Sequence, residues 1–175
     1  MHYPLFEAPG RAVFWLVQVR RRGKVAGRMG GLPSDDQYVL VEFRQRDLPG
    51  FANVNSSLKS VQAKRELNWH LSMLLLCEGL SQNCLPSDEE QALLFRFEDE
   101  VHDALLQADG VRFLARVTHD GRRELIWRLA NPDAANAVLQ RIRNTREYPW
   151  EFDFRIDYDP LWQKAKWYLE AAQSS

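Results

Sequence analysis

The sequence predicts an α+β domain, a ferredoxin-like β-α-β-β-α-β antiparallel sheet with extra N-terminal strands and a C-terminal helix. Apolar residues recur at helical spacing in some segments and alternate with polar residues in others, and an Asp-Gly pair separates two alternating segments. The 175 residues are 45% hydrophobic and 27% charged, which is ordinary for a globular protein. We divide the chain into a β-rich extension, residues 1–65, packed on a main domain, residues 66–175.

The main domain begins with a strand over residues 67–77, whose nearly continuous apolar end indicates a central position in the sheet. After a loop, Ser87 and Glu90 have the spacing of a capping box at the start of a helix. Apolar residues at helical spacing follow, and Asp109-Gly110 is a stop signal.

Two strands come next, joined by a turn at His119, Asp120 and Gly121. Asp-Gly favours a tight hairpin because both central positions need a positive φ. In the first strand, one face is expected to carry the residues that alternate with polar neighbours, namely Val111, Phe113, Ala115 and Val117.

Asn131 and Pro132 open a second helix as cap and first residue. Strict alternation then predicts a strand over residues 150–158, and Asp159-Pro160 starts a final helix. The apolar residues expected on that last helix are Leu161, Trp162, Ala165, Tyr168 and Leu169. In the extension we expect strands over residues 12–19 and 37–45, and a turn or short helix over residues 49–58.

The cysteine count and the lengths of the apolar segments predict the cellular compartment. Cys77 and Cys84 are too few for a disulfide scaffold and lack metal-ligand spacing, so we interpret them as plain thiols. No basic segment followed by an apolar stretch opens the chain, and the longest apolar run is too short to span a bilayer. We expect a cytoplasmic protein without membrane contact.

With these segments placed, the chain resembles a bacterial family, the domain-of-unknown-function 695 group. The likeness is carried by the order and spacing of six short segments, at residues 54–59, 68–71, 85–90, 118–124, 148–154 and 159–162. The family is also distantly similar to the regulator of ribonuclease activity B, an acidic α+β protein that inhibits a ribonuclease by binding it. The resemblance implies a binding protein and supplies no catalytic residues.

Residues that could support chemistry are scattered. Glu98 and His102 are four apart on the predicted helix and could reach one ion, but they flank the apolar stripe, so we interpret them as a solvated acidic face. His119 is expected to be a surface turn residue. The sequence has no P-loop, GxSxG or HExxH motif. We predict no enzyme activity, catalytic residue, metal or cofactor.

Charge is unevenly distributed along the chain. Residues 1–85 hold 11 Lys and Arg against 7 Asp and Glu, a net of +4, whereas residues 86–175 hold 12 against 17, a net of −5. The positive part concentrates in a predicted basic loop of Arg20, Arg21, Arg22, Lys24 and Arg28. No aromatic residue is interleaved there, so nucleic-acid binding through this loop is the weaker interpretation.

The negative part concentrates on the first predicted helix. The helix dipole accounts for acids in its first turn but not for the later ones, Glu98, Asp99, Glu100 and Asp103. Trp162 and Trp167 are five apart on the predicted last helix and cannot both point into the core, so one is a candidate interface anchor.

These six residues predict a non-catalytic protein-binding module that inhibits or neutralises a basic partner, such as a nuclease or a bacterial toxin, by occupying its phosphate-binding surface. Three alternatives stay open: a small-ligand-binding or enzymatic domain with a dispersed site using His70 or His119, nucleic-acid binding through the basic loop, and a ligand-sensing dimer. The sequence does not specify the partner or the oligomeric state.

Overall fold

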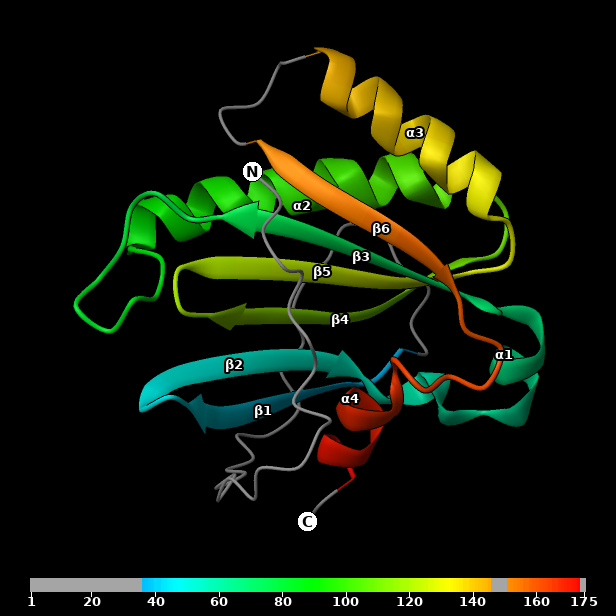
Figure 1. Cartoon of the computed structure of the whole chain (residues 1–175), viewed down its shortest axis with the longest axis horizontal. Coiled ribbons are helices and arrows are strands. Elements are labelled where there is room, and N and C mark those ends of the chain that lie inside the picture. The colour runs from blue at the N-terminus through cyan, green and yellow to red at the C-terminus, as the bar shows by residue number, and fades with distance from the viewer. Residues whose placement is uncertain (1–35, 146–150, 174–175) are drawn as a thin grey trace.

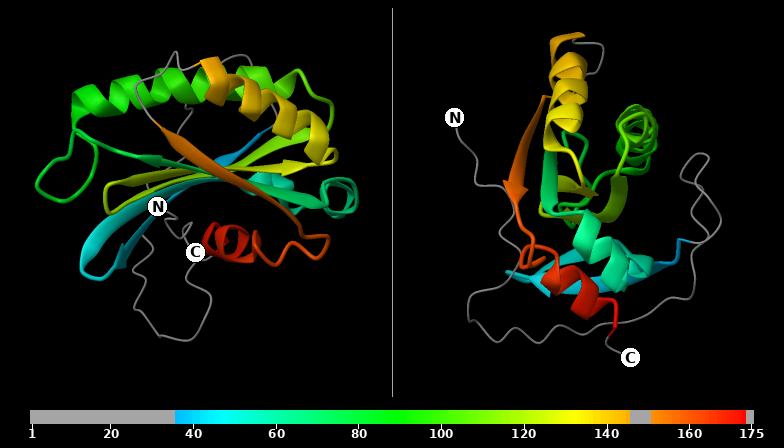
Figure 2. Two further views of the ribbon diagram at one scale, coloured as in Figure 1. Left: turned by 45° about the horizontal axis from the view of Figure 1, so that its top comes forward. Right: turned by 90° about the vertical axis from the view of Figure 1, so that its right-hand side faces the viewer.

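The computed structural model describes residues 36–145 and 151–173, which form one six-stranded antiparallel sheet with helices on both faces (Figures 1 and 2). The strands are β1 Tyr38–Gln45, β2 Leu48–Asn55, β3 Trp69–Leu76, β4 Val111–His119, β5 Arg122–Leu129 and β6 Phe152–Tyr158. The helices are the 3-10 helix η1 Ser56–Lys59, α1 Val61–Glu66, α2 Asp88–Leu106, α3 Pro132–Thr145 and α4 Lys166–Ala171.

The strand order is β1-β2-β4-β5-β3-β6. The last four strands and the helices α2 and α3 make the β-α-β-β-α-β arrangement, and both helices lie on one face while α4 lies on the other (Figure 2). The predicted fold class is therefore confirmed. The hairpin β1–β2 extends the same sheet at the β4 edge. The strand expected at residues 12–19 lies outside the described residues.

The central strands are buried on both faces. On the α2 side, Leu71 and Met73 of β3 pack with Leu94 and Phe97 of α2. On the opposite side, strand residues pack against the C-terminal segment, which contributes Tyr168. Two-sided burial explains why residues 67–77 show an almost continuous apolar run rather than alternation. Within the described residues, no helix is both long and apolar enough to cross a bilayer.

The turn expected over residues 49–58 is wrong, because most of that segment is strand β2. The turn lies earlier, at Arg46 and Asp47, which adopt φ values of 52° and 64° between paired Gln45 and Leu48. A two-residue hairpin loop needs these positive φ values, and neither residue is Gly or Asn, the usual signal. The short helix expected in this segment is η1, at its end.

The second hairpin is confirmed, with Asp120 at φ 49° and Gly121 at φ 68°. The alternation expected along β4 is wrong, because a β-bulge between Phe113 and Ala115 reverses which side chains face which side. Phe113 belongs to the α2-side core, whereas Ala115 and Val117 belong to the opposite core.

The bulge is stabilised by a side chain from the neighbouring strand. Asn55, fully buried at the end of β2, donates from Nδ2 to the carbonyl oxygen of Phe113 at 3.1 Å. A bulge disrupts the ladder of backbone hydrogen bonds, and this bond gives a carbonyl at the bulge a partner.

The last helix begins later than expected. α4 starts at Lys166, because Trp162 adopts φ 56° and interrupts any helix from Asp159 onward. Asp159 instead stabilises a turn, accepting hydrogen bonds from the backbone of Gln163 at 2.8 Å and Lys164 at 3.1 Å. Leu161 is 77% exposed, so its expected place on the apolar face is also wrong.

A buried ion pair joins this turn to the sheet. Arg128 of β5 is 0% exposed and donates to the carboxylate of Asp159 at 2.8 Å and to the carbonyl oxygen of Leu67 at 2.9 Å. Its guanidinium stacks on Trp162, 4.3 Å from the ring centroid. Burial shifts the pKa of Arg128 down and the bond to Asp159 opposes that shift.

We expect Asp159→Asn to lower the free energy of unfolding by about 3–5 kcal/mol, because it leaves the charge of Arg128 buried without a counter-ion. Asp157→Asn is the matched control, since Asp157 forms ion pairs with Arg155 and Lys164 near the surface. It should cost less than about 1 kcal/mol. Chemical denaturation of both variants measures the difference, and equal losses would contradict this role for Arg128.

A second buried carboxyl forms no ion pair with any residue that the structure describes. Glu124 of β5 is 4% exposed and accepts a hydrogen bond from Ser72, while its Oε2 has no partner among the described residues. Burial raises its pKa to about 7, and the bond from Ser72 and the charge of Arg155 oppose that shift. A folded-state pKa above the unfolded one means that the folded protein holds this proton more tightly.

The stabilisation from that proton is complete below about pH 4.5 and is lost as the pH rises through about 7. The free energy of unfolding of Glu124→Gln, measured by chemical denaturation relative to the wild type, should therefore rise by about 2–3 kcal/mol between pH 5 and pH 8. His70, whose pKa burial lowers to about 3, gives the opposite slope in both proteins and cancels in this comparison. A difference that does not change with pH would show that Glu124 is already ionised at pH 5.

Candidate functional site

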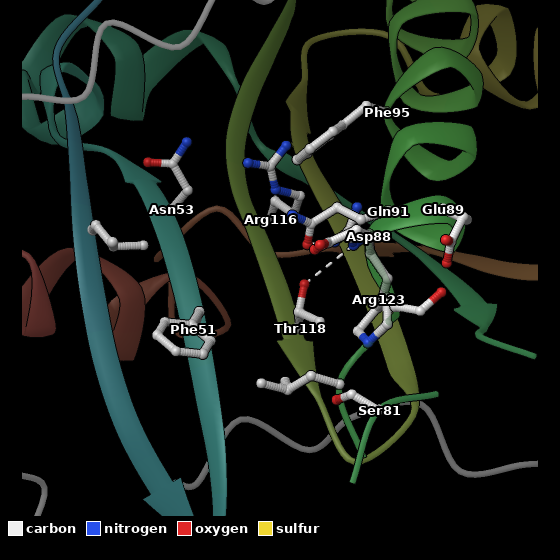
Figure 3. A pocket seen from close by; sticks show the side chains of 14 residues that line it. Phe51, Asn53, Ser81, Asp88, Glu89, Gln91, Phe95, Arg116, Thr118 and Arg123 are labelled. Carbon is white, nitrogen blue, oxygen red and sulfur yellow. Dashed lines mark hydrogen bonds between the residues drawn. The ribbon is translucent and has the colours of Figure 1, made fainter. Parts of the chain in front are cut away.

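A cleft of about 620 Å³ lies on the α2 side of the sheet (Figure 3). It forms because β1 and β2 extend the sheet past α2. The four strands from β1 to β5 in the sheet order supply its floor, and the first half of α2 with the loop before it supplies its wall. It combines polar and apolar groups in a volume typical of ligand sites.

Strand register sets the floor in two rows. Leu40, Asn53 and Arg116 are paired across β1, β2 and β4. Phe51 pairs with Thr118 in the next row, and Arg123 follows on β5. The bulge in β4 is what turns Arg116 and Thr118 towards α2, since uninterrupted alternation would place them on the other face.

Glu98 of α2 binds both arginines of the floor. Its Oε2 accepts from Arg116 at 2.8 Å and its Oε1 accepts from Arg123 at 2.8 Å. Arg123 also donates from Nε to Thr118 at 3.1 Å. Glu98 is 4% exposed and Arg123 only 2%, whereas Arg116 is 20% exposed.

The cluster of Glu98, Arg116 and Arg123 carries one surplus positive charge. Burial lowers the pKa of Arg123 and the carboxylate of Glu98 opposes that shift. Phe95 of α2 stacks on both guanidinium groups, at 4.6 Å from Arg116 and 5.2 Å from Arg123. Cation–π contact over an aromatic face is favourable for both groups.

The wall of the cleft is fixed by the start of α2. Ser87 accepts a hydrogen bond from the backbone of Glu90 at 3.3 Å, which confirms half of the predicted capping box. The other half does not form, because the backbone N–H of Ser87 donates to the carbonyl of Gly79 at 2.7 Å, while the carboxylate of Glu90 accepts from the backbone of Glu78 at 3.0 Å. Glu90 thereby joins α2 to the segment that directly follows β3. Asp88 and Glu89 are exposed and line the cleft at the start of α2.

The predicted acidic surface is only partly on the surface. Glu100 and Asp103 are exposed and Asp99 is half-buried. Burial and the neighbouring carboxylates of Glu98 and Asp103 raise the pKa of Asp99. The expectation that Glu98 faces solvent is wrong, because two arginines from the sheet draw it into the interior.

The tryptophans do not form the expected exposed anchor. Trp162 is 3% exposed, and Trp167 is partly buried against the same core as Tyr168. Both can pack inward because Trp162 precedes α4, so helical spacing does not separate them. Trp167 contacts Phe43 edge-on at 5.6 Å.

The histidines are buried as well. His102 accepts a hydrogen bond from Trp127 at 3.2 Å and Glu98 is engaged by arginines, so the expected solvated face is wrong for both. His119 is 7% exposed and stacks on Phe43, contrary to its expected surface position. In the described ranges no group of three or more His, Cys, Asp or Glu could hold a metal ion.

The predicted basic loop and the predicted plain thiol remain to be placed. The basic loop of Arg20, Arg21, Arg22, Lys24 and Arg28 lies outside the described residues. Cys77 is buried, and burial raises the pKa of its thiol to about 11, which matches its interpretation as a plain thiol.

Sequence reasoning missed the residues that line the cleft, above all Arg116, Arg123 and Phe95. One signal in the sequence was Leu114, an apolar residue at a position where the alternation of β4 calls for a polar one. Two neighbouring apolar residues, Leu114 and Ala115, are expected where a bulge turns both towards the same core. Nothing in the spacing of Glu98 indicated that its partners would come from strands 18 and 25 residues further along the chain.

The fold and the cleft define an α+β protein with a split β-α-β sheet, one face of which carries a polar pocket. The chain belongs to DUF695, a family of unknown function whose model matches residues 41–170. This confirms the family resemblance. No curated protein and no solved structure matches the chain, so its similarity to the regulator of ribonuclease activity B stays a prediction.

Proposed function

We propose that the protein is a non-catalytic binding module that inhibits or neutralises a basic protein partner, such as a nuclease or a toxin. The observation that carries the proposal is the outward surface of α2. Its second half presents Asp99, Glu100 and Asp103, and Arg96 is the exposed basic residue on this helix. Such a surface increases the rate of encounter with a positively charged protein.

Apolar side chains lie on the same helix. Leu93 is 39% exposed and Phe95 is 36% exposed. Partly exposed large side chains beside charged ones resemble the central and peripheral parts of a protein interface. In this proposal Leu93 and Phe95 act as the apolar anchors of the interface, the role that the sequence analysis gave to a tryptophan.

Inhibition would follow from occlusion. A nuclease binds substrate phosphates with Lys and Arg, and carboxylates on α2 would occupy those groups in place of phosphate.

The test is affinity capture of the tagged full chain from its native extract, followed by binding kinetics with the identified partner. The triple variant Asp99→Asn, Glu100→Gln, Asp103→Asn removes three charges from α2. We expect its association rate at low salt to fall at least about tenfold, because steering depends on these charges. The partner should be basic, and the wild-type protein should block its activity at equal molar amounts.

The matched control removes the same charge from other surfaces, with Asp133→Asn, Glu151→Gln and Glu170→Gln. Equal association rates for the two triple variants would contradict an α2 interface. A captured partner whose activity is unaffected at saturation would contradict inhibition.

A further inference from the structure

The floor of the cleft contains hydrogen-bond donors that the fold does not use. Arg116 donates to Glu98 from Nη1, and the structure shows no hydrogen bond from its Nε or Nη2 to the described residues. Among the described residues, the one hydrogen bond from Nη2 of Arg123 is a 3.5 Å contact with Gln91. Figure 3 places the guanidinium of Arg116 between Asn53 and Phe95, within the cleft. A planar guanidinium with an unused edge matches the two oxygens of a carboxylate.

An acceptor beside this edge is also unused. The Oδ1 of Asn53, directly across from Arg116 in the β2–β4 pairing, is buried and has no hydrogen-bond partner among the described residues. A buried acceptor without a partner is uncommon in folded proteins, and the guanidinium of Arg116 is the donor group that faces it across the pairing. Asn53 marks the polar end of the cleft beside Arg116, whereas the donor available to an anion is the unused edge of Arg116 itself.

Apolar side chains continue from this polar end. Phe51 and Leu40 lie on the strands next to Arg116, and Leu85 lies on the facing loop. Phe95 covers the other side of both arginines. A site with one charged group and adjoining apolar walls fits a small molecule that has one anionic head and a flat apolar body.

The acidic residues in the lining limit the ligand further. Asp88 and Glu89 lie at the start of α2, whereas Arg116 lies beside Glu98, about 13–15 Å further along the helix by its rise per residue. A second anionic group on the ligand would meet these acids. The cleft therefore suits a monoanion.

We propose that the cleft binds a small organic monoanion, with its carboxylate on Arg116 and its flat apolar body against Phe51 and Leu40. This activity is distinct from protein binding through Asp99, Glu100 and Asp103, which do not line the cleft, and Phe95 is the residue that borders both surfaces.

The experiment titrates the full chain with naphthylacetate and, in parallel, with the cation naphthylmethylamine. Calorimetry gives the affinity, and the ¹⁵N-resolved Nε–H signals of the arginines report which guanidinium is contacted. We expect naphthylacetate to bind and to shift the signal of Arg116. Arg116→Met should weaken binding at least about tenfold, since it removes a charge-assisted hydrogen bond.

Two further variants keep the result interpretable. Phe51→Ala should also weaken binding while leaving Glu98 with both arginines. Arg112→Met is the matched control, because Arg112 is on the same strand but pairs with Asp36 outside the cleft. This variant should bind naphthylacetate with the affinity of the wild-type protein.

Three results would overturn the proposal: no binding of naphthylacetate at millimolar concentration, an equal affinity for naphthylmethylamine, or an unchanged affinity in Arg116→Met. The α2 triple variant should retain naphthylacetate binding. The ligand site and the protein interface can therefore fail independently.

Discussion

The arrangement of α2 on the sheet depends on the two ion pairs of the Glu98 carboxylate. This carboxylate binds Arg116 of β4 and Arg123 of β5 at once, so a single helical residue holds two strands. Burying Arg123 without this carboxylate would leave a charge in the interior, which proteins tolerate poorly. The same contact defines the cleft, because it fixes the arginines on the floor while Phe95 from the next turn of α2 covers them. Structure and candidate site therefore share one cluster.

The bulge in β4 is the backbone condition for that cluster. By adding one residue between Phe113 and Ala115, it turns Arg116 towards α2. A strand without the bulge would send this arginine to the opposite face, where Ala115 and Val117 now pack. The cost at the bulge is reduced by Asn55, whose amide bonds the carbonyl of Phe113. An amide in one strand thus supports a charged cluster several residues away.

Local signals in the sequence predicted the elements well where each signal has a single physical cause. Asp120-Gly121 marks a turn that needs positive φ, Ser87 caps α2, and Asn131 accepts from the backbone of Asp133 at 3.0 Å to cap α3. The hairpin at Arg46 and Asp47 was missed because it lacks the usual turn residues, and the other misses arose where the deciding partner is distant in the sequence. Glu98 looks like a surface acid until two arginines from the sheet reach it, and Trp162 looks like a helical residue until Arg128 and Asp159 form a turn around it. The cleft could not be predicted for the same reason, since its residues meet only through strand pairing.

The structure predicts that Glu98 and Arg123 are energetically coupled, and a double-mutant cycle measures that coupling. Chemical denaturation of Glu98→Gln, Arg123→Met and the double variant gives three free energies of unfolding. Glu98→Gln should cost about 3 kcal/mol or more, because it leaves the charge of Arg123 buried without a carboxylate, whereas Arg123→Met should cost less, because Glu98 keeps Arg116. The double change should cost less than the sum by at least about 1–2 kcal/mol. Costs that simply add would contradict this coupling.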